Sequence, residues 1–414
     1  MDEKSILASA ADRIAEHRTA PVELTLKAPD GRPARDAAVR IKLTNHEFKF
    51  GCNAFLLCRI NDAELQHAYE ERFADLLNFA TLPFYWGSYE YQPGKTKEAL
   101  LDAMAQWCRD KGVTAKGHPL VWHEVFPGWA KRLPDDEVVR RQEQRVREIV
   151  PHFKGFVDIW DVVNEANASH RHDNAIGRWI GKDDPAKRVA TALRWAREAG
   201  PETTLIYNDF DVSKANERLV EALIQRQAPL DVIGIQSHMH KGTWPIEKVW
   251  DVCERFGRFG RPIHFTETTV LSGPLKAKDD NDWHKRRTDW RTTPEGEAAQ
   301  VEYGEKLYTT LFSHPAVEAV TWWDFSDHGA WQGAPAGLVS DRMTPKPLYN
   351  RLIELVRKVW CTDVKGSTNT DGRVTATCFF GEHEVRAQLP SGEALRGTFL
   401  ASRRGARSLD VALG

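Results

Sequence analysis

The sequence lacks three features that would each assign it to a class of protein. No run of about 18 apolar residues occurs, so no helix that spans a membrane is expected. Lysine and arginine number 57 against 59 aspartates and glutamates, a net charge of −2, so no basic surplus is available for binding nucleic acid. The six cysteines are scattered, without CxxC motifs or zinc-like spacing. We therefore expect neither a membrane nor a nucleic acid as partner, and buried reduced thiols.

Tryptophan, by contrast, is abundant, with 15 residues in a chain of 414. A content of 41% hydrophobic and 28% charged residues is typical of a folded globular protein. The length allows one (β/α)8 barrel of about 250 residues and further elements. Indole rings stack well on flat ligand faces, so the composition is compatible with sugar binding, although a large aromatic core would give the same count.

Residues 1–20 are charged and carry apolar side chains at helical spacing, so an N-terminal helix is expected. The segment lacks the apolar core of a signal peptide. The protein is therefore either cytoplasmic or, if a signal peptide has been removed, secreted or periplasmic. The sequence leaves both possibilities open.

Two β-rich segments, residues 21–47 and 362–414, flank the centre of the chain. In both, apolar residues alternate with polar ones, and turn sequences separate the runs, a pattern typical of hairpins. Neither segment is long enough to bury a core by itself. We expect the two ends to pair into one small accessory β-sandwich. Its lack of tryptophan favours a packing role.

Residues 48–360 alternate short apolar strands with amphipathic helices. The expected strands lie at 48–53, 79–82, 113–118, 157–163, 204–208, 231–236, 262–266 and 319–323. Strands joined through helices at this spacing pair in parallel with right-handed crossovers, and eight such units close into a barrel. The predicted fold class is therefore α/β, a (β/α)8 TIM barrel that carries the accessory β-sandwich.

Two of the predicted strands end in a glutamate. Glu165 ends the stretch WDVVNE after the fourth strand, and Glu267 ends FTE after the seventh. Active sites of such barrels lie at the carboxyl ends of the strands, so both carboxylates face one mouth. Hydrolysis of a glycosidic bond needs such a pair, one to protonate the leaving oxygen and one opposite it. A single glutamate could equally stabilise a helix dipole, but the pair favours catalysis.

The motifs at these strand ends resemble those of glycoside hydrolase family 10, the retaining xylanases built on a (β/α)8 barrel. The resemblance covers roughly residues 48–358. It is carried by GHPLVWH at 117–123, WDVVNEA at 160–166, YND at 207–209, GIQSH at 234–238, TE at 266–267 and the segment 323–331. It implies that Glu165 is the general acid/base and Glu267 the nucleophile.

The resemblance also implies substrate contacts around the two glutamates. Asn164 would donate to the sugar 2-hydroxyl, a contact that strengthens in the transition state. His238 would hydrogen-bond Glu267 and keep it ionised. Gln236 and His118 match positions that contact the sugar in subsite −1. The hydrophobic walls of that subsite would be Trp122, Trp323 and Trp331.

Residues 82–90 depart from the family pattern. The family shows an asparagine and a lysine before a tryptophan here, and alignment on Trp86 puts Leu82 and Tyr85 at those two positions. Tyr85 and Trp86 are accordingly the candidate substrate contacts of this segment. A site that loses polar partners loses affinity for the sugar they read, so altered glycone subsites are expected. Thr269 likewise replaces the aspartate that the family carries two residues after the nucleophile.

Residues 271–294 form a long connection after the seventh strand. It contains Trp283, Trp290 and several basic residues interleaved with aspartates. Long barrel loops are usually functional or disordered. Two interpretations stay open: an extra wall that binds sugar, including an acidic sugar held by arginines, or a solvated charged loop.

Three functional hypotheses follow. The first is a retaining β-glycosidase of xylanase type, with a β-linked polysaccharide or oligosaccharide as its partner. The second keeps that mechanism for a non-xylan, acidic or decorated glycan, with exo or side-chain-tolerant action. The third is a non-catalytic carbohydrate-binding barrel. None needs a cofactor, and no metal is expected, because His170 and His172 lie in a polar loop without a carboxylate cluster of zinc spacing.

Overall fold

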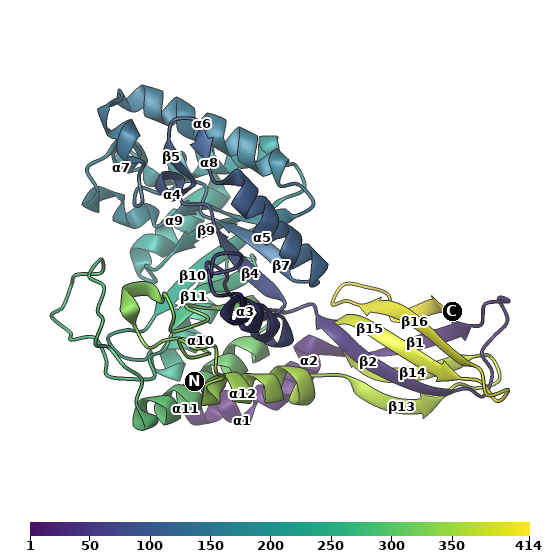
Figure 1. Cartoon of the computed structure of the whole chain (residues 1–414). Helices are drawn as coiled ribbons and strands as arrows, with labels where there is room; N and C mark the ends of the chain where they lie inside the picture. Colours follow the sequence, from purple (N-terminus) through teal and green to yellow (C-terminus); the bar gives the residue numbers. More distant parts are fainter.

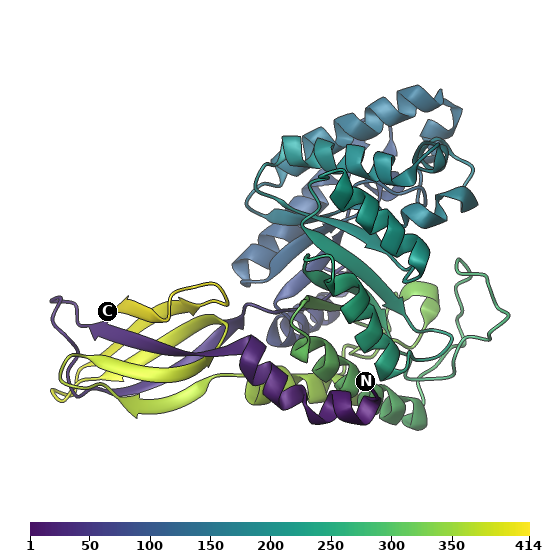
Figure 2. The same ribbon diagram turned by 180° about the vertical axis from the view of Figure 1, so that it is seen from behind.

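The computed structural model describes residues 1–414 as a barrel with a smaller group of strands at one end (Figure 1). The purple N-terminal strand and the yellow C-terminal strands lie side by side in this smaller group, as the view from behind also shows (Figure 2). No helix has the length and apolar character needed to cross a membrane.

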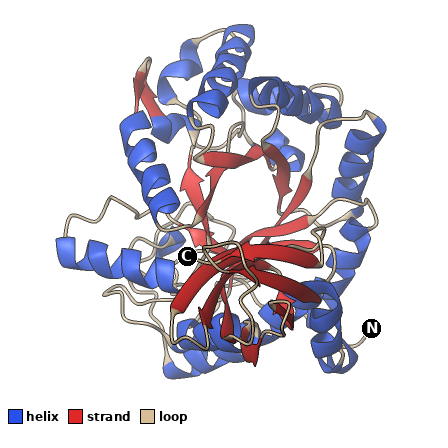
Figure 3. Ribbon diagram, turned by 90° about the vertical axis from the view of Figure 1, so that its right-hand side faces the viewer, coloured by secondary structure: helices blue, strands red, loops and turns tan.

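Eight parallel strands close the barrel in the order β10-β11-β12-β3-β4-β7-β8-β9. Their bounds are β3 (Lys49–Asn53), β4 (Phe79–Pro83), β7 (Thr114–His118), β8 (Val157–Asn164), β9 (Thr204–Asp209), β10 (Val232–His238), β11 (Ile263–Thr269) and β12 (Val317–Trp322). Helices surround this ring of strands in the view from the accessory side (Figure 3). The predicted (β/α)8 barrel is confirmed.

Each strand is followed by a helix that packs on the outside of the barrel. These helices are α3 (Ala63–Leu76), α5 (Glu98–Asp110), α6 (Asp135–His152), α8 (Pro185–Ala199), α9 (Lys214–Gln225), α10 (Ile246–Gly257), α11 (Pro294–Ser313) and α12 (Pro347–Glu354). Local sequence sets their starts: Asp62 accepts from two backbone N–H groups of α3, and Asp184 and Thr293 each accept from one in helices that begin with proline.

Shorter elements lie in the connections between strands and helices. They are α4 (Trp86–Tyr89), β5 (Glu90–Gln92), β6 (Lys95–Thr96), η1 (Gly128–Arg132), η2 (Ala166–Arg171), α7 (Ala175–Gly181), η3 (Trp331–Gly333) and η4 (Leu355–Val359). The barrel interior shows how tightly the strands are fitted. Trp160 is fully buried and lies against Gly117 on the neighbouring strand, where a Cβ atom would collide with its ring.

The accessory part consists of two sheets, β14-β1-β17 and β13-β2-β15-β16. The strands are β1 (Thr19–Lys27), β2 (Ala38–His46), β13 (Asp363–Ser367), β14 (Arg373–Phe379), β15 (Gly381–Gln388), β16 (Ala394–Ala401) and β17 (Ser408–Ala412). Alternate residues of β1, namely Val22, Leu24 and Leu26, are fully buried in the core between the sheets. The chain ends thus form the accessory sandwich that the predicted fold class includes.

The N-terminal segment differs from the single helix expected over residues 1–20. It forms α1 (Glu3–Ala8) and α2 (Ala10–Arg18), and β1 already begins at Thr19. The break falls at Ser9, whose hydroxyl donates to the Ser5 carbonyl while its backbone leaves the helical region.

Arg18 ties the accessory part to the base of the barrel. Its buried guanidinium donates to the carbonyl oxygens of Phe312 (2.6 Å), His314 (2.7 Å) and Val317 (2.6 Å). It also lies 4.8 Å from the centre of the Phe48 ring. The two parts are therefore joined by a buried cation that makes three hydrogen bonds to backbone carbonyls.

Candidate active site

Glu165 and Glu267 both lie at the carboxyl end of the barrel. Glu267 belongs to β11 and is 5% exposed. Glu165 directly follows β8 and has a left-handed backbone with φ of 58°, which is uncommon for a residue other than glycine. Its N–H donates to the Asn208 carbonyl over 2.8 Å, and this bond helps to hold the conformation that aims its side chain.

A network of amides links the two carboxylates. The Asn208 side-chain NH2 donates to Glu267 Oε1 and to Asn164 Oδ1, each over 2.8 Å. The Gln236 NH2 donates to Glu165 Oε1 (3.0 Å) and Asn164 Oδ1 (3.1 Å). Because Asn208 Oδ1 accepts from Thr266, the orientation of its amide is fixed. The predicted residues Asn164 and Gln236 thus lie beside the carboxylates.

Two histidines approach Glu267 from one side. His238 Nε2 lies 3.1 Å from Glu267 Oε2, and His118 Nε2 lies 3.8 Å from Glu267 Oε1. Burial alone would raise the pKa of Glu267, but the positive charges of His118, His238 and Lys116 outweigh it and lower the pKa. The carboxylate is therefore held ionised.

Asp161 fixes the orientation of His118. Its Oδ2 lies 2.7 Å from His118 Nδ1 and 2.5 Å from Lys116 Nζ, with all three side chains buried. Burial would raise the pKa of Asp161, yet Lys116 and His118 lower it. A charged group of three thus supports the nucleophile side of the site from inside the barrel.

Glu165 has the opposite electrostatics. Its burial raises the pKa well above the ordinary value, and the nearby charge of Glu267 raises it further. The hydrogen bond from Gln236 opposes this rise and does not cancel it. One carboxyl group is therefore protonated beside an ionised one, the arrangement that acid-assisted bond cleavage requires.

Aromatic rings surround the carboxylates. The Tyr85 ring centre lies 5.3 Å from that of His118 and 5.5 Å from that of Trp122. Trp323 lies 5.7 Å from His118, and Trp331 lies 4.9 Å from His238. Burial raises the pKa of the Tyr85 phenol, and the charges of Glu267 and Glu165 raise it further, so the phenol stays neutral next to both carboxylates.

Trp86 was expected at the site, and the structure places it elsewhere. It is buried in α4, where its ring contacts Phe126 and Trp129 and its N–H donates to Glu90 over 2.9 Å. The register of the short helix explains this, because Tyr85 precedes the first turn and Trp86 points to the opposite side. Trp86 supports the segment that carries Tyr85.

The sequence hypothesis gave little weight to three polar residues that organise the site. Asn208 bridges the carboxylates, Asp161 orients His118, and the Thr269 hydroxyl lies 2.8 Å from His238 Nδ1 while donating to the Trp323 carbonyl. For Asn208 and Thr269 the position near a strand end was the available signal, whereas Asp161 lies within β8. The substitution at Thr269 replaces a carboxylate with a hydroxyl that still holds the histidine.

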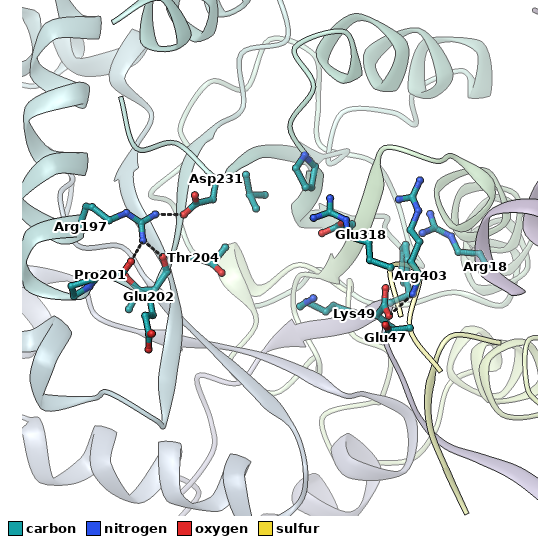
Figure 4. Close-up of a pocket in the computed structure, with 16 residues that line it drawn as sticks. Arg18, Glu47, Lys49, Arg197, Pro201, Glu202, Thr204, Asp231, Glu318 and Arg403 are labelled. Carbon is teal, nitrogen blue, oxygen red and sulfur yellow. Dashed lines mark hydrogen bonds and ion pairs between the residues drawn. The ribbon is translucent and has the colours of Figure 1, made fainter. Parts of the chain in front are cut away.

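The structure has no group of three or more histidine, cysteine, aspartate or glutamate side chains placed to hold a metal ion. A cavity of about 590 Å³ lies at the opposite end of the barrel, where β3, β9 and β10 begin (Figure 4). Part of its charged lining is engaged within the protein: Arg197 binds Asp231 over 2.5 Å, and Arg18 donates to backbone carbonyls. It lies away from the paired carboxylates.

The TIM barrel with a protonated and an ionised glutamate at its mouth defines the class as a glycoside hydrolase. The chain belongs to glycosyl hydrolase family 10, whose sequence profile matches residues 60–355.

Relatives agree with this assignment. Endo-1,4-beta-xylanase B of Thermotoga neapolitana is 30% identical over 58% of this chain and 69% of its own length. The structure of xylanase 10B from Thermotoga maritima superposes with a TM-score of 0.61 at 25% identity, covering 76% of this chain and 97% of that one. The anti-sigma-I factor RsgI6 of Acetivibrio thermocellus is 25% identical over 97% of this chain, which spans only 49% of that relative.

Proposed function

We propose that the protein hydrolyses β-xylosidic bonds of xylan-type glycans by double displacement with net retention. Glu267 is the nucleophile and Glu165 the general acid/base. The observation that carries the proposal is the opposite protonation of two carboxyl groups joined by one amide network. The names of the xylanase relatives support the choice of sugar.

In the first step Glu267 attacks the anomeric carbon while Glu165 passes its proton to the glycosidic oxygen. The bond from carbon to oxygen breaks, and the sugar is held as an ester of Glu267. In the second step Glu165, now ionised, takes a proton from water, whose oxygen attacks the anomeric carbon and frees Glu267. The first proton leaves with the released alcohol, the proton taken from water restores Glu165, and no cofactor enters the balance.

The side chains around the carboxylates suit these steps. Asn164 holds its oxygen toward Gln236 and Asn208 and its NH2 toward Glu165 over 3.1 Å, so the NH2 is available to a sugar hydroxyl near the acid. His238 and His118 stabilise the charge of Glu267 before attack. Trp122, Trp323 and Trp331 offer apolar faces to the sugar ring.

The glycone side recognises its sugar differently from the family pattern. Leu82 is fully buried and offers no hydrogen bond, whereas the neutral phenol of Tyr85 replaces a lysine ammonium close to both glutamates. A phenol offers one donor where an ammonium offers three. We therefore expect Tyr85→Phe to lower kcat/KM for a xylobioside by about tenfold, because one buried hydrogen bond to the sugar is lost.

Non-catalytic sugar binding is the second candidate. On its side stands the similarity of 97% of the chain to a relative whose name, anti-sigma-I factor RsgI6, is not that of a glycosidase. The intact pair of glutamates, with the electrostatics that hydrolysis needs, favours catalysis.

One experiment separates the candidates. The protein is incubated with a panel of 4-nitrophenyl β-glycosides, including the xylobioside, and the anomer released first is read by NMR. Release of the β-anomer from a xyloside supports the proposal. Release of the α-anomer overturns the retaining mechanism, turnover of another glycoside alone overturns the choice of sugar, and binding without turnover supports the non-catalytic candidate.

A further inference from the structure

Residues 276–291, here called the strap, connect β11 to α11 without regular secondary structure. Figures 1 and 2 show this green segment standing out from the barrel on the side away from the accessory strands. Because the accessory part covers the base of the barrel, the strap lies at the mouth that holds Glu165 and Glu267. Its roots are close together, since the Thr293 N–H donates to the Ser272 carbonyl over 2.9 Å.

Charged residues within the strap brace it internally. Lys276 is fully buried, and its Nζ donates to the Asp282 carbonyl (2.8 Å) and to Asp280 (3.1 Å). Arg287 pairs with the same Asp280. These contacts use the interleaved basic and acidic residues within the loop, so the charges hold a defined shape and are not simply solvated.

The strap is also docked on the wall of the active site. The Arg287 N–H donates to the Gln332 carbonyl over 2.8 Å. Trp283 stacks on Trp331, with ring centres 5.9 Å apart and planes 18° apart. Trp331 in turn lies 4.9 Å from His238, the neighbour of Glu267. The strap therefore continues the aromatic wall outward from the nucleophile.

The tip of the strap reaches the opposite side of the mouth. His284 Nδ1 lies 3.5 Å from Glu124 Oε1, and Glu124 Oε2 lies 3.8 Å from His172 Nε2. Glu124 follows β7, whereas the strap follows β11. In the barrel order, β12, β3 and β4 separate these strands on one side and β8, β9 and β10 on the other, so the contact spans the mouth along a diameter.

This course has a consequence for the substrate. The carboxylates project from β8 and β11, so the strap runs in nearly the same direction as the line that joins them. A glycosidic bond held between them belongs to a chain that runs across that line and hence beneath the strap. The end of a chain can enter there, whereas an internal bond of a long polymer has to be threaded.

We propose that the strap directs hydrolysis to chain ends and short oligosaccharides by roofing the two carboxylates. The proposal rests on the proposed glycosidase function and adds the mode of attack. It makes the strap tip, with Trp283 and His284, a determinant of substrate length.

The test compares the wild-type protein with a variant in which residues 281–286 are replaced by Gly-Ser-Gly. This change removes Trp283 and His284, and with them the Asp282 carbonyl that Lys276 contacts, and keeps the ion pairs of Asp280 with Lys276 and Arg287. A second variant, His284→Ala, removes only the contact with Glu124. His67→Ala is the matched control, because His67 is equally exposed (73%) and also faces a glutamate, on α3.

Two activities are measured: turnover of 4-nitrophenyl β-xylobioside, and the loss of viscosity per reducing end released from soluble xylan. The shortened variant is expected to raise the viscosity loss per end by about fivefold and to change xylobioside turnover less than about twofold. His284→Ala gives a smaller rise, and His67→Ala gives none. An equal viscosity loss per end in the wild type and the shortened variant overturns the proposal.

Amide hydrogen exchange tests the position of the strap without relying on any enzymatic activity. Shortening the strap is expected to speed amide exchange in residues 120–126, which the tip contacts through Glu124. Unchanged exchange there overturns the proposal even if no xyloside is cleaved. If no variant cleaves xylosides but the shortened variant exchanges faster in residues 120–126, the proposed function is overturned. The position of the strap across the mouth is then still supported.

Discussion

At the base of the barrel, every donor nitrogen that Arg18 directs into the junction meets a carbonyl oxygen. At the mouth, several buried polar atoms have no partner in the protein. His123 is 1% exposed, yet neither ring nitrogen is hydrogen-bonded, and the indole N–H of Trp122 is also unpaired. Both ends bury polar groups, but the Arg18 junction pairs the nitrogens it directs at the barrel, whereas these groups of the mouth are unpaired.

The difference follows from what each end binds. An unsatisfied buried donor costs about 1–3 kcal/mol, a cost that stability alone would select against. At the base the partner is the backbone of the same chain, so the bonds are complete. At the mouth these groups lie next to residues of the candidate site without a partner in the protein, and functional sites are where such unpaired groups are tolerated. Four predictions test this contrast.

The largest effect is expected at the mouth. Glu267→Ala should lower xylobioside turnover by at least about 10⁴-fold, because both the nucleophile and its charge are lost. The matched control is Glu318→Ala, which removes a half-buried carboxylate that lines the cavity at the base. Turnover measured under single-turnover conditions should be unchanged in the control. Comparable losses of turnover in Glu267→Ala and Glu318→Ala would contradict the assignment of the active site to the mouth of the barrel.

The largest effect on stability is expected at the base. Arg18→Ala should lower the free energy of unfolding by about 3 kcal/mol, because three buried carbonyl oxygens lose their donors. Urea denaturation measures this, with Arg404→Ala, an exposed arginine of the same cavity, as the neutral control. kcat at saturating substrate should stay as in the wild type. A stability loss below that of the control would show that the junction does not depend on Arg18.

A change in pH dependence is expected when the support of the nucleophile is weakened. Because Glu267 acts ionised, kcat/KM falls as pH drops through its pKa, and because Glu165 acts protonated, kcat/KM falls as pH rises through its pKa. His238→Asn removes an imidazole whose hydrogen bond and charge lower the pKa of Glu267, so the acidic limb should move to higher pH. His67→Asn serves as the reference variant. If the acidic limb of His238→Asn lies at the same pH as that of the reference, His238 does not lower the pKa of Glu267.

The smallest effect concerns the pH dependence of the junction. His46 is buried beside Phe50, Phe312 and Phe379, and burial lowers its pKa to about 4. The unfolded chain then binds more protons than the folded chain between pH 6.5 and 4, so stability falls as pH falls through this window. His46→Phe should reduce the loss by about 1 kcal/mol between pH 6 and pH 5. Thermal unfolding at the two pH values checks this, and a slope equal to that of the wild type would contradict it.

The sequence allowed the fold to be predicted because its signals are local. Short apolar runs and the alternation of apolar residues marked the strands, amphipathic stretches marked the helices, and the order of elements implied a parallel barrel. The break at Ser9 was missed because it depends on one backbone conformation within an otherwise helical pattern. Trp86 was misplaced because one residue of register in a four-residue helix decides which side chain faces the site.

The sequence by itself determined that two glutamates end strands of one barrel and that the chain ends are β-rich. Both features depend on the pattern of neighbouring residues, which the sequence shows directly. Only the tertiary structure decided the protonation of those glutamates, because their burial and the charges of Lys116 and His118 on β7 and of His238 on β10 depend on strands other than their own. It also decided that the charges of residues 276–291 brace a loop across the mouth, because Glu124 and His284 are 160 positions apart in a chain that folds them to 3.5 Å.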